Sequence, residues 1–464
     1  MMRYRGFLFT TVLLVASSLF ALTSDELATK MSLNNLEVQK AQQEYRLSLL
    51  DTQDAKAGRG PTIDLTVAGT YMVNPPLGPI TVSTQNLLQQ LSDQGIDVSS
   101  LEGYPDAYLK LYDGMENMLY TFSLNITQPI FTWGKISNSI KLYEKISQVR
   151  FLQAQVLLRK NKSELLGHES ALHYLSLMQD LLTQEAESAS RLVEISSSNR
   201  DNGMLLDEDV LKVRIQAWQV AIALKNVQLQ LDNQVLAIQN LCNDTTLTMK
   251  DMEYIPDETA MKDLYDRGQD VLVAKATSAM VDNLQILGLL KEVSALTKDI
   301  SSASVNWKPD FALSSTIGYG GSRFPLIEKD WYRQDAYTLN FTVALKSTIW
   351  DGGKKLRDVV RSQEKEESSE VDYQSAVQSI RNQIITQYLQ MELVESKIAY
   401  QALVIDSDKK DLQQKQQLLE SGYGSEVDQL KSLMQLQADQ LSLIQLQLDR
   451  VTCYQALSYL SGGI

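Results

Sequence analysis

Two related stretches decide the fold of this chain. Residues 122–135 read FSLNITQPIFTWGK, and residues 341–354, which lie 219 positions further on, read FTVALKSTIWDGGK. Each stretch begins with alternating apolar and polar residues and ends with tryptophan, glycine and lysine. A second pattern starts at Gly203 and again at Gly422: an aspartate follows the glycine after six residues, and a leucine follows after eight. This self-similarity indicates one architecture written twice.

The two copies also agree in length. From Gly134 to Gly203 is 69 residues, and from Gly353 to Gly422 is also 69. The first interval contains one glycine and no proline, and the second contains neither, so both are predicted to be uninterrupted helices. At 1.5 Å per residue each would be close to 100 Å long, which no compact domain can hold. The equal lengths indicate two rigid helices that end at the same distance from the strands that precede them.

The chain divides into a leader, two repeats and a linker. Residues 1–21 are expected to be a secretory signal with an open cleavage position, because two arginines precede an apolar run with small residues. The first repeat is expected over residues 22–242, an equatorial linker over 243–265, and the second repeat over 266–464. After an opening helix in each repeat, the expected elements are strand pairs at 62–71 with 120–129 and 310–319 with 338–349, long helices at 136–200 and 354–420, and returning helices at 207–242 and 426–460.

The expected strands alternate between apolar and polar residues. Between residues 62 and 71, Ile63, Leu65 and Val67 alternate with polar neighbours. Alternation fits either a half-buried sheet in a soluble domain or an outer-membrane strand. We favour the membrane strand, because about ten residues suit a tilted membrane strand and the exported chain has no apolar run long enough for a spanning helix. Aromatic residues near the expected strand ends, where membrane interfaces favour them, are Tyr71, Tyr120, Trp331, Tyr332 and Tyr337.

Four strands are too few to close a membrane barrel. The smallest such barrels have eight strands, and an open edge in lipid would leave backbone groups unpaired. The barrel must therefore be shared between chains. Two copies would give eight strands and three would give twelve, with a polar and wet inner face.

The returning helices carry apolar residues at a spacing of seven. Sustained heptads predict coiled-coil packing of adjacent helices. The first returning helix has two sets of such residues, so it should pack against neighbouring helices on two sides. The first set is Val210, Val213, Ala217, Val220, Leu224, Val227, Leu231, Ile238 and Leu241. The further stripe is Leu211, Ile215, Trp218, Ile222 and Leu229.

The composition argues against several classes of function. A net charge of −14 disfavours nucleic acid as a partner. The two histidines, His168 and His173, lie five residues apart on an expected helix, and no nucleophile elbow, phosphate loop or metal-ligand cluster occurs. We therefore expect no catalysis, metal or cofactor. Cys242 and Cys453 leave two readings open, either a single disulfide bridge or two partly buried thiols.

The signal, the doubled unit, the strand pairs that end in tryptophan and glycine, and the two glycine-aspartate turns together resemble the TolC family of outer-membrane efflux proteins. The likeness covers nearly the whole chain after residue 21. It implies an α+β membrane protein with an internal duplication, in which three protomers give four strands each to a twelve-stranded outer-membrane barrel. That barrel would continue into a long α-helical barrel in the periplasm, with an equatorial region formed by residues 243–265 and the C-terminal residues.

The resemblance also implies a function. The chain would be the outer-membrane channel, or exit duct, of a tripartite efflux or type I secretion system, and would passively export small molecules or proteins. Its expected partners are two further copies in a homotrimer, a periplasmic adaptor protein, an inner-membrane transporter and outer-membrane lipid. The alternative is a trimeric coiled-coil surface protein of the adhesin type, which is also exported and rich in heptads.

The resemblance places functional residues at the two helix-turn-helix tips. Asp428, with its counterpart Asp209, would form the pore constriction at the gating tip, where a ring of carboxylates attracts cations. The alternative is that both are cap or first-turn residues of the returning helices. Lys431 stands where some family members carry a second acidic residue. The expected adaptor-docking residues are Gly203, Met204, Leu205, Leu206, Gly422, Tyr423 and Gly424.

The strand pairs enclose loops of very different length. The first loop covers residues 72–119 and contains a helix-like segment, and the second covers residues 320–336. The first loop is expected to lie outside the cell. The longer one is large enough to cover the channel mouth, but the sequence assigns it no role.

Overall fold

The computed structural model describes residues 22–463, apart from residues 102, 113, 115, 253, 255, 279–280, 306–307 and 322–336. The expected signal at residues 1–21, most of the second loop, and the aromatic residues Trp331 and Tyr332 lie outside this part. The chain forms two compact units, and each unit takes segments from both halves of the sequence. Within the described part, one contains residues from 22–49, 144–294 and 365–463, and the other contains residues from 50–143 and 295–364. The units differ from the two repeats, which stay a prediction.

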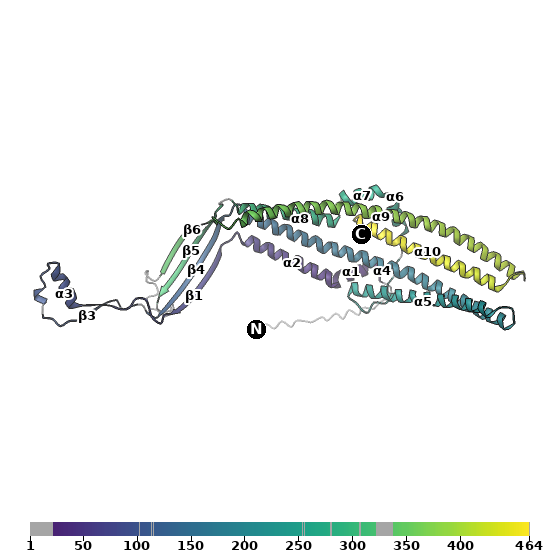
Figure 1. The fold of residues 1–464 in the computed structure, drawn as a ribbon, viewed down its shortest axis with the longest axis horizontal. Coiled ribbons are helices and arrows are strands. Elements are labelled where there is room, and N and C mark those ends of the chain that lie inside the picture. The colour runs from purple at the N-terminus through teal and green to yellow at the C-terminus, as the bar shows by residue number, and fades with distance from the viewer. Residues whose placement is uncertain are drawn as a thin grey trace, which may run out of the picture. The chain divides into compact units, whose positions relative to one another are not determined.

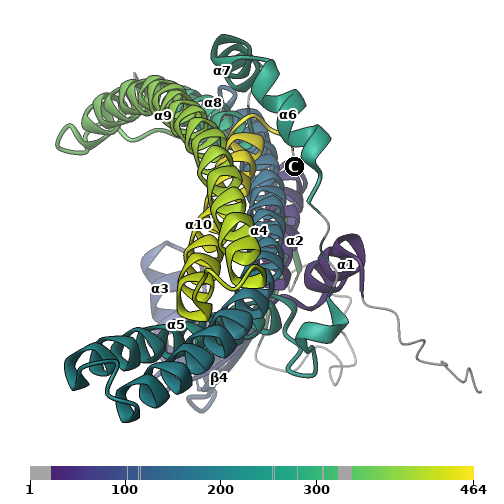
Figure 2. The ribbon, with the colours of Figure 1, turned by 90° about the vertical axis from the view of Figure 1, so that its right-hand side faces the viewer.

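Four helices dominate the first unit. Helices α4 (Lys135–Asp201) and α9 (Lys354–Glu420) have 67 residues each, and α5 (Asp207–Cys242) and α10 (Glu426–Leu460) return from them (Figure 1). Helix α10 contacts α4 through Gln455, whose Nε2 donates to the Leu166 carbonyl over 3.0 Å. It also contacts α9, because Gln401 Nε2 on α9 donates to Asp439 Oδ1 on α10 over 2.7 Å. The helices therefore follow the order α5, α4, α10, α9, with α5 and α9 outermost (Figure 2).

The heptad residues of α5 form its packing face. Val210, Val220, Val227, Leu231 and Ile238 are buried. Burying such side chains is the main source of stability for a helix of this length. The further stripe of α5 behaves differently, because each of its side chains is at least half exposed. These side chains are Leu211, Ile215, Trp218, Ile222 and Leu229. Helix α9, the other outermost helix, also exposes Leu389, Leu393, Tyr400 and Leu403.

The second unit contains one antiparallel four-stranded sheet in the order β1-β4-β5-β6. Its strands are β1 (Thr62–Tyr71), β4 (Met118–Phe131), β5 (Asp310–Gly321) and β6 (Tyr337–Lys346). The two expected pairs are joined because β4 also pairs with β5. Rows of facing residues run across the sheet, and alternate rows are apolar and polar. One row is Leu65, Leu124, Ile317 and Leu339, and the next is Asp64, Asn125, Thr316 and Asn340.

The expectation of a strand to residue 349 was wrong at its C-terminal end. Strand β6 ends at Lys346, which faces Asp310, the first residue of β5. Pro309 precedes Asp310 and has no N–H to extend the ladder, so residues after Lys346 lack a strand partner. The chain turns instead through Gly352 and Gly353, both with positive φ.

The repeated tryptophan-glycine-lysine motif ties the sheet to the long helix. Trp133 and Gly134 have positive φ angles of 53° and 82° and make the turn between β4 and α4. The Trp133 Nε1–H donates to the Pro309 carbonyl over 2.9 Å. Lys135 Nζ pairs with Asp310 Oδ1 over 2.9 Å. Both contacts join the start of α4 to the start of β5.

Each repeat opens with two helices where one was expected. They are α1 (Ser24–Asn34) and α2 (Leu36–Ala57) in the first repeat, and α7 (Gln269–Ser278) and α8 (Asp282–Ala303) in the second. Asn35 separates α1 from α2, and its Oδ1 accepts hydrogen bonds from the backbone N–H groups of Glu37 and Val38. The linker is partly helical as well, since it contains η2 (Met249–Asp251) and most of α6 (Glu258–Asp266).

Three buried titratable groups belong to the core of the first unit. Cys242 and Cys453 are buried and unpaired, so the single bridge is not formed. Burial raises the pKa of the Cys242 thiol to about 11. Glu169 on α4 is 2% exposed, and burial raises the pKa of its carboxyl to about 7; the nearby Asp25 carboxylate adds to the rise and the Ser24 hydroxyl opposes it.

Glu169 predicts a pH-dependent stability. Its pKa is higher in the folded chain, about 7, than the ordinary value of 4.5. Protonated Glu169 therefore contributes to the stability of the folded state. This contribution to the free energy of unfolding, at most about 3 kcal/mol, is fully present below about pH 4.5 and is lost as the pH rises to about 7. Glu169→Gln should abolish that part of the pH dependence of thermal unfolding, followed by circular dichroism.

The exposed Glu187 on the same helix gives a matched control. Glu187→Gln should keep the wild-type pH dependence. An unchanged pH dependence in Glu169→Gln would contradict the assignment.

Candidate functional site

The two helix-turn-helix tips share one backbone design. In the first tip, Gly203 has a φ of 76° and the N–H of Met204 donates to the Asn199 carbonyl over 2.8 Å. In the second, Gly422 has a φ of 78° and the N–H of Tyr423 donates to the Leu418 carbonyl over 3.0 Å. Each helix thus ends in a Schellman motif whose left-handed residue is glycine. The two glycines found by the repeat are therefore required by the backbone.

Gly424 is needed for a different reason. A Cβ at this position would lie 2.6 Å from the Leu419 backbone nitrogen, closer than side chains approach. The second turn therefore folds tightly back on the end of α9. The first turn has Leu205 at the corresponding position, and that side chain is half-buried.

The expected adaptor-docking residues form two small apolar tips. Met204 is 72% exposed, Leu206 is 70% exposed and Tyr423 is 89% exposed. Gly203 and Gly422 lie beside them at the surface. The structure thus places apolar side chains in solvent at the end of each hairpin.

Asp209 and Asp428 lie in the first turns of α5 and α10, and neither is a helix cap. The N-cap positions are Leu206 and Ser425, and Ser425 Oγ accepts a hydrogen bond from the Val427 N–H over 3.2 Å. The cap alternative is therefore wrong, whereas the first-turn alternative is confirmed. A carboxylate in the first turn interacts favourably with the helix dipole.

The two aspartates differ in their surroundings. Asp209 is half-buried, and its Oδ1 lies 3.6 Å from Lys212 Nζ. Asp428 is exposed, and within the described part of the chain it forms no ion pair. Asp428 therefore has the freer charge of the two.

An arginine that sequence reasoning missed joins the two hairpins. Arg191 Nε on α4 lies 3.0 Å from Glu426 Oε1 on α10, and Arg191 Nη1 lies 2.8 Å from Glu194. These two carboxylates raise the pKa of Arg191. The partners Arg191 and Glu426 are 235 positions apart, so no spacing rule could have found the pair.

Lys431 lines a cavity of about 580 Å³ between α4, α5 and α10. Glu185, which is buried and has its pKa raised by burial, lines the same cavity. The position that departs from the family pattern thus faces the space between the two hairpins rather than adding a second acidic ring.

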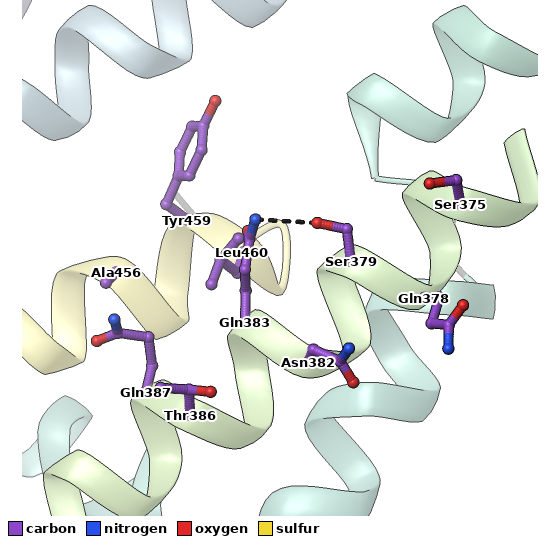
Figure 3. Close-up of a pocket in the computed structure, with 10 residues that line it drawn as sticks. All are labelled: Ser375, Gln378, Ser379, Asn382, Gln383, Thr386, Gln387, Ala456, Tyr459 and Leu460. Atoms are coloured by element: carbon purple, nitrogen blue, oxygen red, sulfur yellow. Dashed lines mark hydrogen bonds between the residues drawn. The ribbon is translucent and has the colours of Figure 1, made fainter. Parts of the chain in front are cut away.

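A larger groove of about 680 Å³ lies between α9 and α10 (Figure 3). No side chain in its lining carries a formal charge, and Gln383 Nε2 donates to Ser379 Oγ over 3.2 Å. The groove therefore presents amides and hydroxyls without a nucleophile and its base. Its lining consists of Ser375, Gln378, Ser379, Asn382, Gln383, Thr386 and Gln387 from α9, and Ala456, Tyr459 and Leu460 from α10.

The two histidines contact a glutamine and a tyrosine. His168 Nδ1 lies 2.6 Å from Gln234 Oε1, and the ring of His173 packs edge-on against Tyr174. Among the residues described, no group of three or more metal-ligating side chains could hold a metal ion. None of the described helices is both long and apolar enough to cross a bilayer.

Comparison with known proteins agrees with this geometry. Residues 277–463 match the model of the family "outer membrane efflux protein". A search of curated protein sequences finds no match. The fold resembles that of the outer membrane protein VceC from Vibrio cholerae, with a TM-score of 0.71 and 15% identity over 95% of this chain and 96% of that one.

Two further solved channels have the same fold. The open-state MtrE outer membrane channel of Neisseria gonorrhoeae gives a TM-score of 0.72 and 11% identity, over 95% of this chain and 89% of that one. The CmeC outer membrane channel of Campylobacter jejuni gives a TM-score of 0.70 and 12% identity, over 95% and 85%.

The fold and the tips define the class of protein. The fold of this chain is that of solved outer-membrane channels, and the adhesin-type alternative is not favoured. Residues 277–463 match the outer membrane efflux protein family, in agreement with the predicted resemblance to the TolC family.

The tip geometry predicts the effect of changing Gly422. Gly422→Ala should destabilise the turn by about 1–2 kcal/mol, because a Cβ is strained at positive φ. Gly422→Asn should recover part of this loss, because asparagine tolerates that conformation. Amide hydrogen exchange at residues 418–425 would measure both changes.

Gly78→Ala is the control, since a Cβ there would meet nothing within 4 Å and the φ is not positive. Equal exchange at the turn in wild type and Gly422→Ala would contradict the prediction.

Proposed function

We propose that three copies of this chain form the outer-membrane exit duct of a tripartite efflux or type I secretion system. The observation that carries the proposal is the open sheet. Within the described residues, β1 pairs only with β4, and β6 pairs only with β5. Apolar side chains on both edge strands are more than half exposed, including Leu65 at 68% and Phe341 at 72%.

The strand directions allow the sheet to continue from copy to copy. Four antiparallel strands alternate in direction, so β6 of one copy and β1 of the next would also be antiparallel. A ring of copies then closes without an edge, as lipid requires. Two copies would give eight strands, whose interior is filled by side chains, whereas twelve strands leave more room for a channel. This favours three copies.

The helical layer supports the same assembly. Its outermost helices, α5 and α9, expose apolar stripes that nothing in the single chain covers among the described residues. In a ring, α5 of one copy would lie beside α9 of the next, and the heptad spacing of the α5 stripe suits coiled-coil packing. The helices would then form the wall of a periplasmic tunnel that continues the barrel.

The tips suit the remaining roles. Met204, Leu206 and Tyr423 offer exposed apolar side chains to a periplasmic adaptor, which would couple the duct to an inner-membrane transporter. Three copies of the exposed Asp428 would form a ring of carboxylates at the constriction and would favour cations. Transport through the duct would be passive, and outer-membrane lipid would surround the barrel.

Single-channel conductance of the detergent-extracted oligomer in a planar bilayer tests the proposal. We expect discrete, cation-preferring steps from a particle with the mass of three copies. Asp428→Ala should weaken the cation preference, because it removes three carboxylates from the ring. Glu187→Ala is the control, since Glu187 is an exposed carboxylate on α4 away from the tip.

Each result has a distinct meaning. Steps unaffected by Asp428→Ala would keep the channel and remove Asp428 from the constriction. A well-folded trimer that never conducts, even with its adaptor present, would contradict the duct.

A further inference from the structure

The long first loop is an ordered insertion between β1 and β4. It contains β2 (Ile80–Ser83), α3 (Thr84–Asp93), η1 (Ser99–Leu101) and β3 (Tyr108–Tyr112), and β2 pairs with β3. A hydrogen bond from the Met72 N–H to the Asn117 carbonyl, 2.7 Å long, closes its base. Asp106, which lies just before β3, contacts the junction between β2 and α3, because its Oδ1 accepts a hydrogen bond from Ser83 Oγ over 2.6 Å.

The insertion has almost no core of its own. Of its described residues, only Val98 is buried. Strand β3 is exposed along its whole length, with Tyr108 at 74% and Leu109 at 56%. Other apolar side chains left in solvent are Val73, Leu77, Ile80, Leu87, Ile96, Leu101, Tyr104, Leu111 and Tyr112.

Such a module needs a partner surface. A two-stranded sheet is only marginally stable in water unless a further surface covers it. The helix α3 contacts β2 but leaves Leu87 about half exposed at 47%. The many exposed apolar side chains of this module favour an interaction site.

The charge of the insertion argues against a lipid surface as that partner. Residues 72–117 contain one basic residue, Lys110, and six acidic ones. Phosphate-bearing lipid headgroups attract basic clusters and repel acidic ones. Asp97 and Asp106 are occupied in capping contacts within the insertion, which leaves its apolar side chains as the features available for protein contact.

We propose that the three insertions of one trimer pack against one another through these apolar side chains and form a cap over the outer mouth of the duct. The inference rests on the trimeric assembly proposed above. The insertion follows directly from β1, the edge strand at the seam between copies, so a neighbouring copy is always close. Tethering on one barrel gives the insertions an effective concentration on the order of millimolar, at which modest apolar complementarity is sufficient.

The cap acts as an outer gate. The apolar side chains of each insertion are covered only by residues from the other two copies. The three insertions are therefore most stable when the cap is closed. Exported material has to separate them, and solutes outside the cell meet a closed surface. The inner constriction and the outer cap then control opposite ends of one duct.

Disulfide cross-linking in isolated outer membranes tests the cap. The two native cysteines are buried, so Leu109→Cys would introduce the accessible thiol. Under oxidation, roughly two thirds of the chains should run as dimers, because one cysteine per chain can link only two of three neighbours. Leu87→Cys is a second variant in case Leu109→Cys disturbs β3. Gln89→Cys, on the polar face of α3, is the matched control and should stay monomeric.

The mass of the extracted particle is measured on the same samples. A trimer in which Leu109→Cys and Leu87→Cys cross-link no better than Gln89→Cys would overturn the cap and leave the duct intact. A particle of one copy would overturn both proposals. Cross-linking at Leu109 and Leu87 within a trimer, without cross-linking at Gln89, would support the cap.

Discussion

The structure depends on one constraint, the unpaired backbone at the two edges of its sheet. Every N–H and C=O group in lipid needs a partner, and the cost of leaving one unpaired is several kcal/mol. Among the residues that the structure describes, strands β1 and β6 each present such an edge. In the assembly proposed here, other copies complete the four strands. The exposed stripes on α5 and α9 would pack against neighbouring copies in the same ring.

The duplication supplies matched parts for that ring. Helices α4 and α9 have equal lengths of 67 residues and end in the same Schellman motif. The two tips therefore follow helices of equal length, a condition for meeting a common partner. The two tips also differ: Asp209 lies beside Lys212, whereas Asp428 forms no ion pair within the described part of the chain. Arg191 of one hairpin pairs with Glu426 of the other. The first strand pair alone carries the large, acidic and apolar insertion.

Local patterns in the sequence predicted most of the fold. The alternation over residues 62–71 matches β1, because neighbours along one strand decide which face is apolar. The heptads of α5 predicted its buried face, whereas its further stripe, expected to contact a second neighbour, is exposed in the single chain. Features that depend on distant partners were missed. Strand β6 ends at Lys346 because β5 begins at Asp310, and Arg191 meets Glu426 only in the folded chain. The sequence left open whether the two aspartates are caps or first-turn residues, and they lie in the first turns because Leu206 and Ser425 hold the N-cap positions.

The most direct test of the central claim is an electron cryomicroscopy reconstruction of the particle extracted from outer membranes. The account predicts three copies around one axis, with the backbone of β1 in each copy hydrogen-bonded to β6 of the next and α5 lying beside the neighbouring α9. A particle in which β1 and β6 remain unpaired, or in which another segment of the same chain covers these edges, would contradict it.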